Sequence, residues 1–366
     1  MTAEGMPLPA DTAPPEAPEP VADSGKARRR TPDAAIPSRR ERSVPHAGWM
    51  VVAGKEFADH LWSPRFVILL GILGIVALIP MYFVADAIRS AAGTLNGQSS
   101  IFLFMFTVAP NVGDTGVQIP SALTFVTLVG PLLGIVFAFD AVNGERSAGT
   151  LPRLLSQPIY RDDVINGKFA AGLSAIALVL TLVVGAIAAF GIIRLGIVPG
   201  AEDLLRIVVW LIVTFLYVSI WLAFGLLLSV LVRGAATSAL VGFGVWFLLT
   251  ILGGLVTSVI KGVVAPITGT LDQQAAAAAL QQTITRLQPS VVYQEASASL
   301  LNPQVASVSN PATIGGYEQL AQRIPSLQSF DQSLLLIWPH MVVMLAITVA
   351  FFAIAYVRFM RQEVRA

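Results

Sequence analysis

Six long apolar runs, each without an Asp, Glu, Lys or Arg, constrain the fold of this chain more than any other feature. A bilayer core of about 30 Å needs roughly 20 apolar residues in a helix. The backbone polar groups of such a run must be satisfied within the segment, and only a helix does this economically. We therefore predict an all-α integral membrane protein with six transmembrane helices, at Phe66–Val84, Ser121–Phe139, Phe169–Ile193, Ile207–Val232, Ser238–Ile260 and Leu334–Val357.

The composition of the chain points to lipid as its solvent. Of its 366 residues, 55% are hydrophobic and only 12% are charged, whereas about a quarter of the residues of a soluble domain are charged. The sequence has no cysteine, which excludes disulfides and thiolate metal sites. Three widely separated histidines do not suggest a metal cluster either.

Lysine and arginine are unevenly distributed among the connections. They are frequent in the N-terminal region, in the connection between the second and third runs, and in the C-terminal tail, and they are sparse elsewhere. Segments on the cytoplasmic side of a membrane carry the excess of Lys and Arg. We therefore predict a multi-pass protein of the cytoplasmic (plasma) membrane with both termini in the cytoplasm, and an even number of crossings is consistent with this.

The N-terminal region, residues 1–48, differs from the rest of the chain. It is rich in Pro, Ala and acidic residues and then in Arg, and it has no periodic apolar pattern. This composition predicts a disordered cytoplasmic tail in front of a membrane domain at residues 49–366. The tail has no apolar core of the kind found in a secretory signal peptide. Binding of its arginines to anionic lipid headgroups is the functional alternative.

Two connections on the predicted outer side are long. The larger, residues 261–333, contains the Ala- and Gln-rich stretch Gln273–Gln288, which has good helix propensity. We expect this external loop to be small and mostly helical. The other contains Ile101–Ala109, an apolar stretch too short to span, which we expect to be re-entrant or interfacial.

The segment before the first run, Trp49–Phe66, predicts an amphipathic helix on the cytoplasmic surface of the membrane, an N-terminal interfacial elbow. Lys55 and Glu56 are its polar residues, Trp62 is expected at headgroup depth, and Pro64 should end the helix. An ordinary juxtamembrane anchor explains the same pattern.

The connection Asp140–Lys168 holds most of the charge of the membrane domain. Within it, the spacing of apolar residues predicts a short helix at about Thr150–Ser156. The apolar face of this helix must be covered, either by a partner protein or by the helix ends of the chain itself. The face consists of Leu151, Leu154 and Leu155, and Gly149 and Pro158 bound the helix.

This connection resembles the signature loop of the ABC-2 type transporter permeases. The residues that carry the resemblance are Phe139-Asp140, Glu145, Gly149-Thr150-Leu151, Leu154-Leu155-Ser156, Pro158, Arg161 and Gly167-Lys168. Other stretches agree: Lys55-Glu56 with Ser63-Pro64-Arg65-Phe66, Pro289 with Tyr293, Glu295 and Leu300-Leu301-Asn302-Pro303, and Trp338-Pro339 with Phe359 to Arg365. The pattern extends from Trp49 to the C-terminus and is most similar to the branch that includes the permease of the copper-maturation system of nitrous oxide reductase.

The resemblance implies a six-helix permease that works as a homodimer or paired with a second permease. Two ATP-binding cassette subunits would dock beneath it and bind the ATP and Mg²⁺, so this chain would hold no cofactor and no catalytic residue. Movement would reach the membrane helices through the elbow and the loop. Carried onto this chain, the coupling surface would comprise Glu145, Gly149, Thr150, Leu151, Leu154, Leu155, Pro158, Arg161 and Lys168, with Glu145 and Arg161 making polar contacts.

The sequence contains no G-x-x-x-x-G-K-[ST] phosphate-binding loop, so we expect ATP to be handled by another chain and this one not to be an enzyme. An ion-coupled secondary transporter is the alternative, but it needs ionisable residues within the membrane, which the six runs lack. A membrane scaffold without transport activity also fits. Membrane lipid is an expected partner and nucleic acid is not.

Three smaller features suggest local roles. His340 and Met344 have a spacing that more often reflects helix packing than a metal site, so no metal is expected. Asp162 and Asp163 are expected to cap the third span. Gly71, Gly74, Gly242 and Gly244 are candidates for close helix packing.

Overall fold

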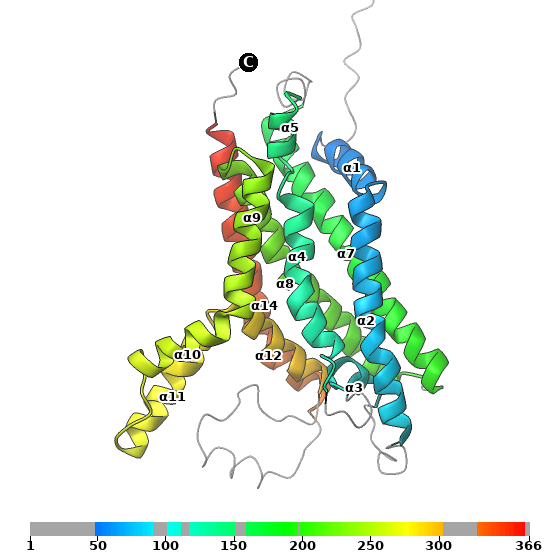
Figure 1. Ribbon diagram of the computed structural model, residues 1–366, viewed down its shortest axis with the longest axis vertical. Helices are drawn as coiled ribbons and strands as arrows, with labels where there is room; N and C mark the ends of the chain where they lie inside the picture. Colours follow the sequence, from blue (N-terminus) through cyan, green and yellow to red (C-terminus); the bar gives the residue numbers. More distant parts are fainter. Residues whose placement is uncertain are drawn as a thin grey trace, which may run out of the picture. The chain divides into compact units, whose positions relative to one another are not determined.

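A computed structural model describes residues 48–90, 101–110, 117–150, 159–196, 198–302 and 328–362 of the chain. Every regular element of these residues is a helix (Figure 1). In this described part of the chain, five helices are long and apolar enough to cross a membrane. They are α2 (Pro64–Ser90), α4 (Ala122–Ala138), α7 (Arg161–Leu195), α8 (Ala201–Leu231) and α14 (Phe330–Met360), which confirms the predicted fold class.

The fifth apolar run is not the continuous helix that the sequence predicts. It divides into α9 (Ala235–Trp246), a π-helical turn η2 (Phe247–Ile251) and α10 (Gly253–Val264), with a bend of 58°. The bend occurs where Gly253 and Gly254 adjoin the π turn, and both features are known causes of helix kinks. The amide of Gln288 donates to the carbonyl oxygen of Gly253 (2.8 Å) and to the hydroxyl of Thr257 (3.2 Å). Within the described residues, a sixth crossing therefore has to come from this bent segment.

The shorter helices are α1 (Gly48–Leu61), α3 (Ile101–Thr107), α5 (Asn143–Ser147), α11 (Leu271–Thr285) and α12 (Pro289–Leu301). The Ala- and Gln-rich stretch forms α11 as predicted, beginning at a capping box between Thr270 and Gln273. The short apolar stretch forms α3, but protein rather than lipid covers it. Phe106 of α3 is fully buried and lies edge-on to Trp210 of α8, with ring centroids 5.2 Å apart.

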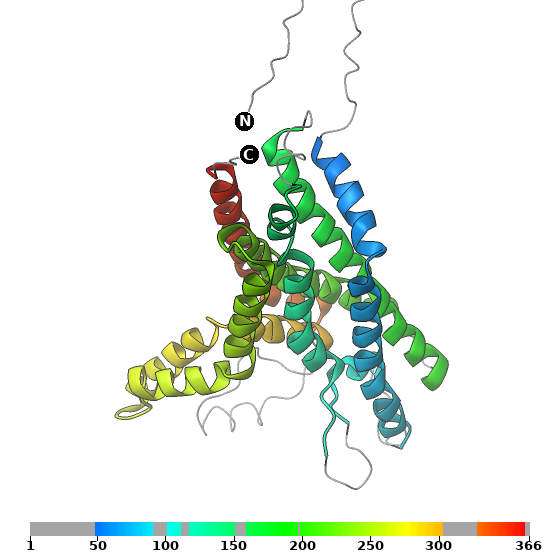
Figure 2. The same ribbon diagram turned by 45° about the horizontal axis from the view of Figure 1, so that its top comes forward.

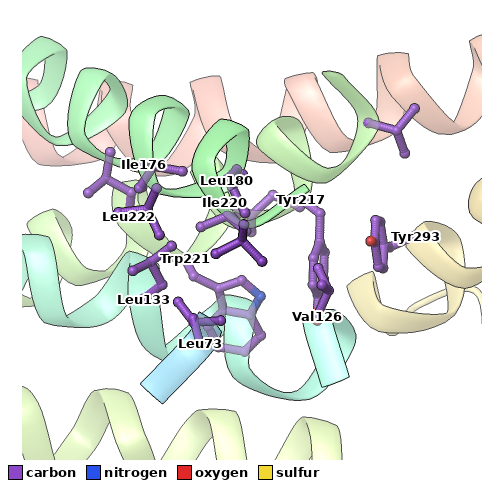
Figure 3. Close-up of a cluster of buried hydrophobic side chains, with 14 of the residues drawn as sticks. Leu73, Val126, Leu133, Ile176, Leu180, Tyr217, Ile220, Trp221, Leu222 and Tyr293 are labelled. Atoms are coloured by element: carbon purple, nitrogen blue, oxygen red, sulfur yellow. The ribbon is translucent and has the colours of Figure 1, made fainter. Parts of the chain in front are cut away.

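Helix α8 lies at the centre of the packing, and α4 approaches it closely. A Cβ atom at Gly134 of α4 would lie only 2.7 Å from the carbonyl oxygen of Val218 and 2.8 Å from the amide nitrogen of Leu222. Figure 3 shows Leu133 of α4 beside Trp221 and Leu222 of α8. Tyr217 of α8 stacks on Tyr293 of α12, with centroids 4.4 Å apart. Gly134 thus permits the backbones of α4 and α8 to come into direct contact.

The helix bundle has two ends. At one, here named the loop end, lie α1, α5, the start of α7 and the end of α14 (Figures 1 and 2). At the other, the α12 end, α12 packs between the start of α8 and the start of α14. There the guanidinium of Arg206, which is buried, donates to Glu202, Ser333 and the backbone oxygens of Leu300 and Gln328. All five of its N–H donors are used in these bonds.

Candidate functional site

The predicted coupling residues that the structure describes lie at the loop end. The connection after α4 turns there because Ser229, near the end of α8, accepts hydrogen bonds from the backbone amides of Val142 (2.9 Å) and Asn143 (3.1 Å). The first amides of a helix have no partner within the helix. Ser229 supplies that partner for α5 and so fixes where Glu145 lies.

Lys168, on the second turn of α7, is the centre of this site. Its side chain is only 3% exposed, and its Nζ lies 2.7 Å from Glu145 Oε1 and 3.1 Å from Glu56 Oε1. A buried ammonium is costly unless carboxylates pair with it. Here one carboxylate comes from α1 and the other from α5, so a single cation joins the elbow helix, the loop helix and α7.

The charges continue outward from Lys168 along α1. Glu56 also pairs with Lys55 (3.2 Å), and Lys55 pairs in turn with Asp59 (3.0 Å). Burial alone would raise the pKa of the Glu56 carboxyl, but the two lysines together hold that pKa below its ordinary value. The alternating chain of Asp59, Lys55, Glu56, Lys168 and Glu145 thus extends from the exposed face of α1 to the buried loop.

Helix α1 packs directly on the first turns of α7. A Cβ atom at Gly167 would lie 2.6 Å from Cβ of Val52 and 2.8 Å from the carbonyl oxygen of Trp49. Asp163 accepts a hydrogen bond from the backbone amide of Trp49 at 3.0 Å. We predicted that Asp163 caps its own helix, but the bond shows that it caps the start of α1. The two helices are therefore joined at successive turns of α7.

The end of α1 and the start of α2 complete the elbow. Pro64 is the first residue of α2, as its missing N–H allows. Arg65 forms an ion pair with Asp140 at the end of α4. Trp62, between the two helices, is 89% exposed. The helix and its break lie where they were predicted, and the position of α1 at a membrane surface stays a prediction.

A second set of contacts joins the loop end to the end of α14. Arg161 donates to the backbone oxygen of Gln362 (2.9 Å), and its guanidinium lies 5.7 Å from the ring centroid of Phe359. Arg146 donates to the side-chain oxygen of Gln362 (2.6 Å). The side-chain NH2 group of Gln362 donates in turn to the backbone carbonyl of Val230 (2.8 Å). Arg161 and Arg146 thus hold the end of α14 to the loop end through their side chains, and the predicted partner contact of Arg161 stays a prediction.

Two more of the predicted coupling residues follow α5. Gly149 has a φ of 66°, which favours glycine. Thr150 is exposed, and its amide (2.9 Å) and hydroxyl (3.2 Å) donate to the backbone oxygen of Glu145. The predicted helix at Thr150–Ser156 lies outside the described residues, except for its first residue, Thr150. The same holds for the other predicted coupling residues, Leu151, Leu154, Leu155 and Pro158.

Sequence reasoning missed several residues of this site. Ser229 of α8 and Gln362, just after α14, contribute hydrogen bonds from parts of the chain that are far away in the sequence. His60 lies edge-on to Phe137 with ring centroids 5.2 Å apart. A serine close to the end of an apolar run was the only local signal for Ser229. Lys168 was expected on the partner-binding surface, but its side chain is only 3% exposed.

His340, considered above as a metal ligand, contacts Glu295 instead. Its Nε2 lies 3.1 Å from Glu295 Oε2, which also accepts from Arg286 at 2.7 Å. Within the described residues, no three His, Asp or Glu side chains gather in a way that suits a metal ion. This cluster connects α12 with α14 at the α12 end.

Comparisons with known proteins place these features in context. The model of the ABC-2 family transporter proteins matches residues 50–364. The chain is similar to the probable ABC transporter permease protein NosY of Stutzerimonas stutzeri, with 30% identity over 213 residues, which cover 56% of this chain and 67% of that relative. It is also similar to the protein of the same name from Pseudomonas aeruginosa, with 36% identity over 101 residues, covering 27% of this chain and 36% of the relative.

Proposed function

The chain belongs to the ABC-2 family of transporter proteins, and we propose that it is an export permease driven by ATP that a separate subunit hydrolyses. Family and relatives together make it a multi-pass membrane subunit of an ABC transporter. We infer the direction of transport, export, from the resemblance of its loop and elbow to those of ABC-2 type permeases. In this proposal the loop end faces the cytoplasm of the cell, in the plasma membrane, and both termini lie on that side.

The arrangement around Lys168 is the observation that carries the proposal. An ATP-binding subunit bound to the loop end would contact α5 and the exposed Thr150 next to it. Any displacement of α5 moves Glu145, and the ion pairs of Lys168 connect Glu145 to α7 and to Glu56 of α1. Glu145 Oε2 is buried and accepts no hydrogen bond from the described residues, so the carboxylate of Glu145 is held at the site through its Oε1 bond to Lys168.

We propose that two permease copies, or this chain and a second permease, form the passage. The outward face of α9 and η2 supports this pairing, because an uninterrupted apolar stripe follows it at helical spacing. Gly244 in this stripe has open space around the position of a Cβ, which permits close approach of another helix. The stripe consists of Leu240, Phe243, Gly244, Phe247, Leu248 and Ile251.

The buried charged residues do not support the alternative of an ion-coupled transporter. Arg206 uses all five of its N–H donors inside the protein, and Lys168 is paired with two carboxylates at the loop end. Both residues have structural partners that account for their burial.

The test is ATP hydrolysis by the complex that the tagged chain forms in its native membrane. We expect a purified complex with an ATPase whose activity falls several-fold in Glu145→Ala, because this variant loses the link between loop and elbow. Asp272→Ala, on the exposed start of α11, is the matched control and should leave hydrolysis unchanged. Purification without any ATPase, or equal hydrolysis in all three proteins, would contradict the proposal.

A further inference from the structure

Helix α10 presents three different faces along its length. Gly253 and Thr257 are buried against Gln288. A second, polar and small face is exposed and carries Gly254, Ser258 and Gly262, with Lys261 beside it. The third face is apolar, covers about half of the circumference at 3.6 residues per turn, and is exposed along its length. It consists of Leu255, Val256, Val259, Ile260, Val263 and Val264.

Protein does not cover the apolar face within the described part of the chain. Val259 is 66% exposed and Val263 is 77% exposed. Apart from Gln288, the main neighbours of α10 among the described elements are η2 and α11. A hydrogen bond from Gln281 to the carbonyl of Ala265 (2.7 Å) holds α11 to the end of α10. An apolar face of this size in a membrane protein needs an apolar solvent or a partner.

The length of the preceding helix indicates where α10 begins relative to the bilayer. Helix α9 has 12 residues and η2 has 5. At 1.5 Å per residue they extend about 25 Å, which is close to the roughly 30 Å thickness of the hydrocarbon core. The 58° bend then falls near the far edge of that core, and the next helix leaves the direction of the span there (Figures 1 and 2).

The bend is built in a way that suits this depth. A break in a helix releases backbone polar groups that lipid cannot satisfy. The side chain of Gln288 is buried and satisfies the carbonyl of Gly253 at the break. The opposite faces of α10, one apolar and one with a lysine, a serine and glycines, are the pattern of a helix that lies in the plane of a membrane interface.

We propose that α10 is an interfacial helix that binds the outer surface of the lipid bilayer, and that it does not complete the fifth span. Leu255, Val259 and Val263 enter the acyl region of the lipid. Ser258 and Lys261 face water. The lipid thereby anchors the α10–α11 pair beside the α12 end of the bundle, irrespective of what the protein transports.

The absence of native cysteines permits a direct test in the full chain. A nitroxide spin label is attached to Val259→Cys or to its neighbour Ser258→Cys, in phosphatidylcholine vesicles. Collision rates are measured with molecular oxygen, which concentrates in hydrocarbon, and with a nickel chelate, which stays in water. We expect the ratio of oxygen to nickel accessibility to be several-fold higher at residue 259 than at residue 258.

A second adjacent pair, Val263→Cys and Gly262→Cys, repeats the test one turn further on and replaces the first pair if either variant does not fold. Two high oxygen ratios in a pair would show that α10 continues the span, and two low ratios would show that it lies outside the membrane. Either result overturns the proposal. Strong dipolar broadening at residue 259 would show that a second copy covers the face, and this also overturns it.

Discussion

At the scale of single residues, the ammonium of Lys168 has the largest electrostatic cost at the loop end. It is almost fully removed from water, and Glu56 and Glu145 repay that cost because both lie within ion-pair distance. Lys55 carries the same charge but is 61% exposed on α1. Exposed ion pairs contribute about 0–1 kcal/mol, so the two lysines should differ strongly in importance.

We predict that Lys168→Met destabilises the protein by about 3 kcal/mol, since it leaves two carboxylates near each other without their shared cation. Lys55→Met is the matched control and should cost less than about 1 kcal/mol. The measurement is the free energy of unfolding in detergent micelles, followed by circular dichroism. Equal losses in the two variants would show that Lys168 is not the centre of the site.

His60 gives the loop end a dependence on pH. Burial is the main cause that lowers the pKa of its imidazole, and the positive charge of Lys168 lowers this pKa further. The carboxylates of Glu56, Asp140 and Asp59 raise the pKa, but burial prevails over them. The folded protein therefore binds a proton at His60 less readily than the unfolded chain does. Stability from this group is complete above the ordinary pKa of about 6.5 and decreases as the pH falls below that value toward the lowered pKa.

We expect His60→Gln to reduce the loss of unfolding free energy between pH 7 and pH 5, because glutamine has no proton to bind in this range. Unfolding midpoints at a series of pH values measure the difference. If the wild type and the variant have parallel pH profiles, His60 is not the group responsible.

At the scale of elements, the contact between α4 and α8 is closest at Gly134. Gly134→Ala places a methyl group against the backbone of α8 at Val218 and Leu222, which cannot move aside as a side chain can. We predict a destabilisation of about 1–3 kcal/mol from this overpacking. Gly71→Ala on α2 is the control, because a Cβ there meets no atom within 4 Å.

The variants are compared by thermal unfolding in the same detergent. A melting temperature that falls for Gly134→Ala and stays unchanged for Gly71→Ala agrees with the packing described above. Equal melting temperatures for the two variants would mean that the close approach of α4 to α8 at Gly134 does not contribute to stability.

The sequence predicts elements well where composition decides them. Apolar runs must be helical in lipid, which made the long spans predictable, and the helix propensity of the Ala- and Gln-rich stretch made α11 predictable. Among the glycines chosen as packing candidates, only Gly242 has a close neighbour in another helix, Ile135 at 3.0 Å from its Cβ position, whereas Gly71, Gly74 and Gly244 have none within 4 Å. The bend at Gly253 depends on Gln288, which is remote in the sequence, so no local pattern indicates it.

At the scale of the whole molecule, the loop end joins four helices through side chains from distant parts of the chain. Glu145 and Lys168 were predicted as parts of a coupling surface, which stays a prediction, and their ion pairs with each other and with Glu56 arise only when α1 packs on α7. Arg161 and Arg146 fasten the end of α14 to the same place. An ATP-binding subunit that moved this end would therefore act on α1, α7 and α14 together.

The central claim is that this permease binds its ATP-binding subunit at the loop end, and site-specific crosslinking tests it most directly. Cysteines at Thr150, exposed beside α5, and at Asp272, exposed on α11, are each given a photoactivatable crosslinker in native membranes. We predict that Thr150→Cys crosslinks to a subunit carrying the G-x-x-x-x-G-K-[ST] motif and that Asp272→Cys does not. The account is contradicted if that subunit crosslinks only at Asp272, or at neither position.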